Sequence, residues 1–167
     1  MNIEPRLSLK YQLDEKSSVK ISFNRNVQYV SLISYTSIST PDDIWKLADP
    51  YFKPIKANQL ALGYFRNFKD NAIETSVEVY YKRLSDLTEF KNNANINLNQ
   101  NLETEIINTN GKNYGIEVYL KKNKGRLQGW LSYTYARALK KTDGSDVTEQ
   151  INNNSYYSSS YDKPHDL

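Results

Sequence analysis

Residues 75–83 read TSVEVYYKR, and their side chains alternate between two kinds of environment. Thr, Val, Val and Tyr stand at the odd positions, whereas Ser, Glu, Tyr and Lys stand at the even ones. Because successive side chains of a β-strand point to opposite faces, this pattern predicts a strand with one apolar and one polar face. The apolar face would cover a core in a soluble sandwich, but would face lipid in a transmembrane barrel whose polar side lines a wet lumen.

The same alternation recurs along the chain and predicts six strands. They cover residues 7–13, 18–29, 59–68, about 74–83, 113–121 and 127–136. Polar turns at 14–17, 69–73 and 122–126 join them in pairs, which predicts three hairpins. The expected fold is therefore all-β, an antiparallel up-and-down meander of about six strands in sequence order, with all three tight turns at one edge.

The lengths of the connections favour the barrel. Long links, rich in Asn, Ser and Thr, are expected over residues 30–58, over 84–112 and after Arg137, and they alternate strictly with the short turns. Outer-membrane barrels have short turns at one end and long loops at the other. Structureless loops of more than about 12 to 15 residues are uncommon in compact soluble domains.

The composition excludes several classes of protein. Only 38% of the 167 residues are apolar, which predicts a thin core, while 14 Tyr residues suit strands and water interfaces. The net charge of +3 is scattered, so no nucleic-acid partner is expected, and the absence of Cys removes disulfides and thiolate chemistry. Residues 1–13 do not resemble a secretory signal, and the most apolar run, LALGYF at 60–65, is far shorter than the roughly 20 residues of a spanning helix.

No motif predicts an enzyme or a cofactor site. The chain has no GxSxG, HExxH or glycine-rich phosphate loop. His165 stands near Asp162 and Asp166, but this spacing is poor for a metal, and a junction between loop and strand explains it equally well. The oxygens of a second acidic run could suit calcium, but the run lacks the EF-hand spacing, and a solvated loop is the better interpretation; its residues are Asp143, Asp146 and Glu149.

Two loops carry the only candidate ligand-binding residues. Trp45, Tyr51 and Phe52 lie in a loop stiffened by Pro41, Pro50 and Pro54, so their rings could be displayed for stacking on a sugar or another flat group. The favoured alternative is that they pack the loop onto a barrel rim or join an interfacial belt. The last loop invites the same idea at lower weight through Tyr156, Tyr157 and Tyr161.

Four segments resemble the barrel of TonB-dependent outer-membrane receptors, and most closely those for nutrient uptake. They are KANQLALGYFRNF, ETSVEVYYKRLSDLTEFK, NYGIEVYLKKNKGRLQGWLSYTYARA and the terminal YDKPHDL. The resemblance implies a Gram-negative outer membrane, a barrel of about 22 strands around a plugged lumen, and energy passed on by TonB to release a nutrient inward. The chain is then expected to be a segment from the middle or later part of the barrel, without plug domain, signal peptide, TonB-contacting segment or closing strand.

The partners that the resemblance implies are outer-membrane lipid, the rest of the barrel with its plug, and TonB through regions outside this chain. An alternative function is a soluble β-sandwich or adhesin-like module that binds carbohydrate through its Tyr-rich loops. A hydrolase on a β scaffold has no supporting residues. In the barrel, Val77, Val79 and Tyr81 are expected to face lipid, because burying Glu78 and Lys82 in hydrocarbon would be costly.

Overall fold

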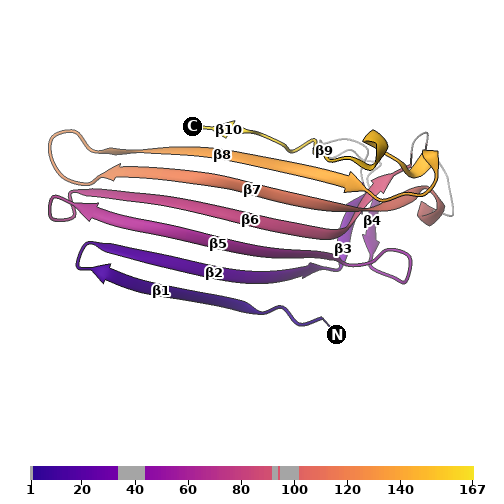
Figure 1. The fold of residues 1–167 in the computed structure, drawn as a ribbon, viewed down its shortest axis with the longest axis horizontal. Coiled ribbons are helices and arrows are strands. Elements are labelled where there is room, and N and C mark those ends of the chain that lie inside the picture. The colour runs from indigo at the N-terminus through magenta and orange to yellow at the C-terminus, as the bar shows by residue number, and fades with distance from the viewer. Residues whose placement is uncertain (1, 34–43, 92–93, 95–101) are drawn as a thin grey trace.

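Six long strands dominate the computed structural model, which describes residues 2–33, 44–91, 94 and 102–167 (Figure 1). All six lie where alternation predicts strands, and no helix interrupts them. They are β1 (Arg6–Asp14), β2 (Ser17–Gln28), β5 (Ile55–Phe68), β6 (Ile73–Phe90), β7 (Ile106–Lys122) and β8 (Gly129–Thr142).

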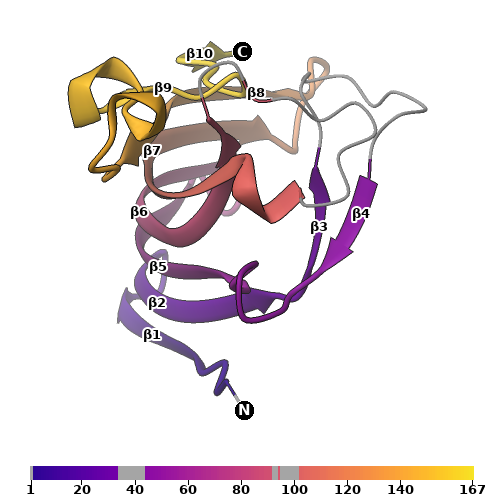
Figure 2. The ribbon, with the colours of Figure 1, turned by 90° about the vertical axis from the view of Figure 1, so that its right-hand side faces the viewer.

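The strands form the predicted meander. The sheet has the order β1-β2-β5-β6-β7-β8-β10, and each long strand pairs antiparallel with the next. The three tight turns lie together at one end and the longer connections at the other (Figure 1). The sheet is one curved layer that does not close, since β1 and β10 (His165–Asp166) are its two edges (Figure 2).

The predicted links at the loop end are partly strand, which corrects their boundaries. β6 continues to Phe90 and β7 begins at Ile106, so residues 84–90 and 106–112 of the predicted link belong to strands that pair with each other. β8 likewise begins at Gly129 and extends to Thr142, past the predicted end at residue 136. A β-bulge explains the error in β6: the register shifts between Leu84 and Leu87, where Asp86 has φ 61°, and the shift reverses the alternation beyond it.

Short strands also raise the number above the expected six. β3 (Val30–Ile33) and β4 (Ile44–Leu47) pair with each other inside the first predicted link. β9 (Tyr157–Ser158) and β10 add two short pairings to β8, so the main sheet has eight strands. The 3₁₀ turns η1 (Leu102–Thr104), η2 (Val147–Glu149) and η3 (Asn152–Asn154) lie in the connections. None of the helices in the described part is long and apolar enough to cross a membrane.

Specific polar contacts close the tight turns. In the β5–β6 turn, Asp70 and Asn71 have φ 52° and 62°, and the Ala72 N–H donates to the Lys69 carbonyl at 3.1 Å. Lys69 has φ 50° as well, so three consecutive left-handed residues reverse the chain between the paired Phe68 and Ile73. In the β1–β2 turn the Asp14 carboxylate accepts the Lys16 N–H at 2.7 Å.

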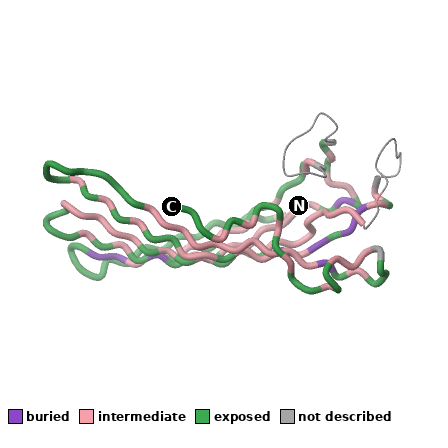
Figure 3. Tube along the Cα trace, turned by 90° about the horizontal axis from the view of Figure 1, so that it is seen from above, coloured by how far each residue is buried: buried purple, intermediate pink, exposed green. Residues whose placement is uncertain are grey.

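The pattern of exposure is the reverse of that in a soluble protein. On β6, Val77 and Val79 are 38% and 42% exposed, whereas Glu78 between them is half-buried. This alternation recurs along parts of β5 and β6, and most of the trace is exposed or half-buried (Figure 3). Among the described hydrophobic side chains only Phe52, Ile106 and Ile107 are buried, and no second sheet covers the apolar face of the main sheet. A two-layer sandwich is therefore not the architecture of the described residues.

Candidate functional site

Cross-strand register gathers the apolar side chains into a continuous band on one face of the sheet. Its middle row contains Leu9, Ile21, Leu62, Val79 and Ile116. The row nearer the turns contains Tyr11, Val19, Tyr64, Val77 and Val118, and the row nearer the loops contains Leu7, Phe23, Leu60, Tyr81 and Tyr114. We call these three rows the apolar band; nearly all of its side chains are exposed.

The opposite face, which we call the inner face, is polar and crossed by aromatic rings. One of its rows contains Lys10, Lys20, Gly63, Glu78 and Glu117. A Cβ on Gly115 would lie 3.0 Å from the Tyr80 ring, so the glycine provides the space in which that ring lies across the neighbouring strand. Gly63 similarly admits the Phe65 ring, which would be 2.8 Å from its Cβ.

A pocket of about 200 Å³ lies on this inner face near the loop end. Strand residues Tyr80, Asn113, Ala136 and Ala138 help to line it, and the last loop contributes a side made by Tyr161, Asp162 and Lys163. The small alanines leave room, while two phenols, an amide and an ammonium can hydrogen-bond a polar ligand. Of the predicted aromatic residues, Tyr161 is the one placed here; Tyr80 and Asn113 were not predicted, because they approach it only through strand pairing.

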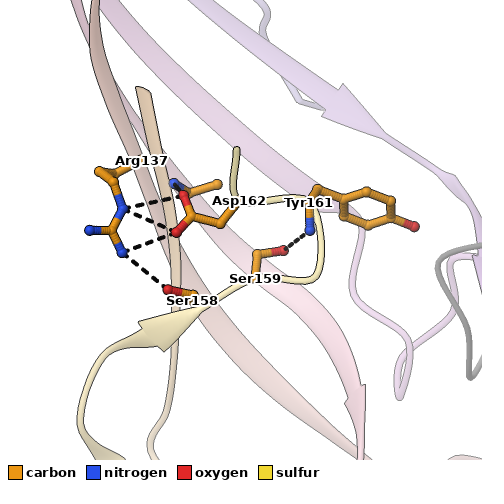
Figure 4. Close-up of polar contacts among 6 residues, drawn as sticks. Arg137, Ser158, Ser159, Tyr161 and Asp162 are labelled. Carbon is orange, nitrogen blue, oxygen red and sulfur yellow. Dashed lines mark hydrogen bonds and ion pairs between the residues drawn. The ribbon is translucent and has the colours of Figure 1, made fainter. Parts of the chain in front are cut away.

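An ion pair fixes the loop that carries Tyr161. Asp162 accepts the Ala138 N–H at 2.7 Å and the Arg137 Nε–H at 3.0 Å, while Arg137 Nη2 donates to Ser158 Oγ at 3.1 Å (Figure 4). The backbone hydrogen bond from Ala138, helped by Ser158 and the Arg137 guanidinium, lowers the pKa of the Asp162 carboxyl below its usual value. The loop is therefore attached to the edge of β8 at neutral pH.

In the first aromatic loop, one of the three candidate rings is buried and two are exposed. Phe52 is only 4% exposed and packs with Ile106 and Phe90, which matches the packing alternative for that ring. Trp45, at 69% exposed, and Tyr51 remain open to solvent. Hydrogen bonds from the Phe52 and Tyr51 N–H groups lower the pKa of the Asp49 carboxyl, which closes the turn beneath these rings. Pro41 lies outside the described residues.

The other two tyrosines of the last loop lie in different surroundings. Tyr156 lies under the Lys112 ammonium, which is 3.7 Å from its ring centroid. Tyr157 is half-buried, its hydroxyl has no hydrogen-bond partner in the described residues, and burial raises its pKa to about 12. The phenol therefore stays neutral at physiological pH, beside the ion pair of Glu89 with Lys140 on the inner face.

Three of the acidic candidates form ion pairs, and the His165 imidazole contacts a phenol. His165 Nδ1 is 2.8 Å from Tyr133 Oη, while Asp162 pairs with Arg137 and not with the imidazole. Asp143 pairs with Lys141 at 2.9 Å and Glu149 with Lys91 at 3.1 Å. Across residues 2–33, 44–91, 94 and 102–167, no group of three His, Cys, Asp or Glu side chains could hold a metal ion.

Comparison with known families gives one match. The family model described as TonB dependent receptor-like, beta-barrel, matches residues 2–164, which include all six long strands and the loop with Tyr161. No curated protein and no solved structure matches the chain significantly.

Proposed function

The chain belongs to the TonB-dependent receptor β-barrel family, and from this membership we propose that it forms part of a receptor that binds a nutrient and imports it across the outer membrane of a Gram-negative bacterium. The proposed role is transport, not catalysis. The observation that carries it is the two-faced sheet: an exposed apolar band on one side and a polar, ring-crossed inner face on the other. A wall between lipid and an aqueous lumen needs both faces.

The orientation follows from the connections. Short turns of outer-membrane barrels face the periplasm and long loops face the outside. The turns after β1, β5 and β7 would then be periplasmic, and the loops carrying Trp45 and Tyr161 would meet incoming ligand.

We propose that the barrel is completed by other parts of a longer protein. The backbone groups along the outer sides of β1 and β10 have no strand partner among the described residues, and an open edge in hydrocarbon is costly. Further strands would pair with these edges, a plug would fill the lumen, and TonB would act through regions outside residues 1–167.

The inner-face pocket is the proposed contact for the nutrient. Its rings, amide and ammonium suit a ligand with hydroxyl or carboxylate groups and a flat face. The exposed loop residues Trp45, Tyr51 and Tyr156 are weaker candidates for the first capture of the same ligand.

Uptake by the source bacterium tests the proposal. Depletion of medium components would be measured by mass spectrometry for the wild type, for a strain lacking the full-length gene, and for a strain lacking TonB. We expect at least one component to be consumed only when both genes are present. Equal consumption by all three strains would contradict a role in TonB-dependent import.

A matched pair of variants tests the pocket once that component is known. Tyr80→Ala removes a ring from the pocket, and we expect about a tenfold rise in the concentration for half-maximal uptake, equivalent to about 1.4 kcal/mol of binding. Tyr114→Ala removes a ring from the apolar band and is the control. The same loss of uptake in both variants, at equal amounts of folded receptor, would argue against a contact at Tyr80.

A further inference from the structure

A row of cations borders the apolar band on the side of the loops. Arg25 pairs with Asn58, Asn58 with Arg83, and Arg83 with Lys112, so the row crosses four neighbouring strands, β2, β5, β6 and β7. Neighbouring strands lie about 4.8 Å apart, so the row runs about 14 Å across the wall, and Arg83 and Lys112 are its adjacent pair. We call Arg25, Arg83 and Lys112 the basic row.

The basic row shares its face with the apolar band. Each cation stands two residues from a member of the loop-side row: Arg25 from Phe23, Arg83 from Tyr81, and Lys112 from Tyr114. Residues two apart on a strand point the same way. The three charges therefore lie on the outside of the barrel wall, at the upper boundary of its lipid-facing surface, and not on the inner face.

No carboxylate in the described part of the chain forms an ion pair with the basic row. The acidic side chains nearby already have partners: Asp86 binds Lys56 at 3.1 Å, Asp143 binds Lys141, and Asp162 binds Arg137. None of the ion pairs between described residues includes Arg25, Arg83 or Lys112. The Arg25 Nε is buried and has no hydrogen-bond partner there, which is a costly state for a guanidinium nitrogen.

A hollow of about 330 Å³ adjoins the row. It is lined by Tyr81, Arg83, Asn110, Lys141, Asp143 and Tyr156, with the backbone of Gly111 between them. Lys112 stands over the Tyr156 ring at the same margin. The hollow is polar and lies where the apolar band ends, so it can receive a charged group whose attached chains remain on the band.

We propose that the basic row binds the phosphate of a membrane-lipid headgroup in the leaflet on the loop side. The headgroup phosphate would bridge Arg83 and Lys112, which are paired across β6 and β7, and its acyl chains would lie along the apolar band. Arg25 would add positive charge farther along the row. Clusters of Lys and Arg at a membrane boundary attract anionic headgroups, and arginine offers paired donors that fit phosphate oxygens. Continuity with the lipid-facing band favours a lipid over a soluble anion.

Native mass spectrometry of the full-length receptor in neutral detergent tests this, with dioleoyl phosphatidic acid as the probe. We expect it to bind more tightly than dioleoyl phosphatidylcholine. The triple variant R25Q/R83Q/K112Q should weaken phosphatidic acid binding about a hundredfold, or roughly fivefold for each cation. Heat-modifiable migration on gels would verify that each variant is folded, and Arg83→Gln alone would be measured if the triple variant is not.

The control removes the same number of positive charges from the inner face. K20Q/K82Q/K121Q changes three cations whose neighbours in register belong to the inner face, and Lys82 is adjacent to Arg83 on β6. We expect it to keep wild-type lipid affinity. An equal loss in both triple variants, no preference for phosphatidic acid, or displacement by equimolar inorganic phosphate would each overturn the proposal. Nutrient is absent from this experiment, so its outcome is independent of transport.

Discussion

Adjacent residues on β6 face different environments, lipid on one side of the sheet and water on the other. Val79 belongs to the middle row of the apolar band, and Glu78 belongs to the inner face. In the full-length receptor, Val79→Lys places a charge in hydrocarbon and should lower the free energy of unfolding by about 2 to 4 kcal/mol. Glu78→Gln should cost much less, since its side chain faces water. Reversible unfolding in bilayers measures both, and equal costs would mean that the faces are assigned the wrong way round.

Gly115 is a position where no side chain fits. A Cβ there would stand 2.6 Å from the Tyr135 carbonyl oxygen and 3.0 Å from the Tyr80 ring. Gly115→Val should therefore lower the free energy of unfolding by about 1 to 3 kcal/mol, the usual cost of overpacking. Gly129→Val is the control, because its Cβ would have no neighbour within 4 Å. Similar costs at both positions would show that the strand propensity of valine, and not the clash at Gly115, determines the change in unfolding free energy.

Protonation of Asp162 should release the last loop. Its pKa is lowered in the folded state, so the contact adds stability above the ordinary carboxyl pKa of about 3.9 and loses it as pH falls through the lower folded value. We expect protease cleavage within the loop to accelerate below pH 4. Asp162→Asn should be cleaved rapidly at pH 7 and show little further change with acid. If acid accelerated cleavage of the variant as much as that of the wild type, a group other than Asp162 would control the release of the loop.

At the scale of elements, the β5–β6 turn depends on backbone conformation at Asn71. With φ 62°, this residue is in the left-handed region, which costs most side chains about 1 to 2 kcal/mol. Asn71→Ala should destabilise the hairpin by about 1 kcal/mol relative to Asn71→Gly. Both variants lose the hydrogen bond from Asn67 Nδ2 to Asn71 Oδ1, so their difference in unfolding free energy isolates the backbone. Identical stabilities would contradict a left-handed backbone at Asn71.

Alternation alone predicts the turn-side halves of the strands and fails at their loop-side ends. The bulge at Asp86 reverses the phase of β6, so LTEF reads as irregular although it is paired with β7. β7 begins with two adjacent isoleucines, Ile106 and Ile107, followed by polar residues, so no alternation marks its start. β3 and β4 are too short for their period to be detected. These elements depend on partners distant in sequence.

Predicting the two sites from sequence requires more information than predicting the strands, because it requires the register between strands. The basic row joins residues on three strands, and a one-residue error in the register of one strand would move its member to the other face. Composition can detect cations but not the register that aligns Arg83 with Lys112. The same holds for Tyr80 and Asn113 in the inner pocket, whereas the exposed loop aromatics could be found from sequence because they need no partner.

For the whole molecule, the sheet leaves two edges. Among the described residues β1 pairs only with β2, and β10 only with β8, so their sheet is open at both edges. Reconstituted alone into liposomes, the chain should show no defined single-channel step, because bacterial barrels close with at least about eight full-length strands. Fusing these liposomes with a planar bilayer and recording the current measures this. A reproducible conductance step would mean that copies of the chain close against one another.

The strict two-residue period of the wall also constrains how such a receptor can evolve. Inserting one residue within β6 would turn every following side chain to the opposite face of the sheet and place Glu78 or Lys82 in lipid. Tolerated insertions and deletions within the spanning region are therefore expected to involve two residues at a time. A tight-turn hairpin such as β5–β6 preserves both period and direction when it is copied whole. Duplication of hairpins therefore provides a route to wider barrels, while single-residue drift is confined to the loops, where ligand preference can change without disturbing the membrane-facing surface.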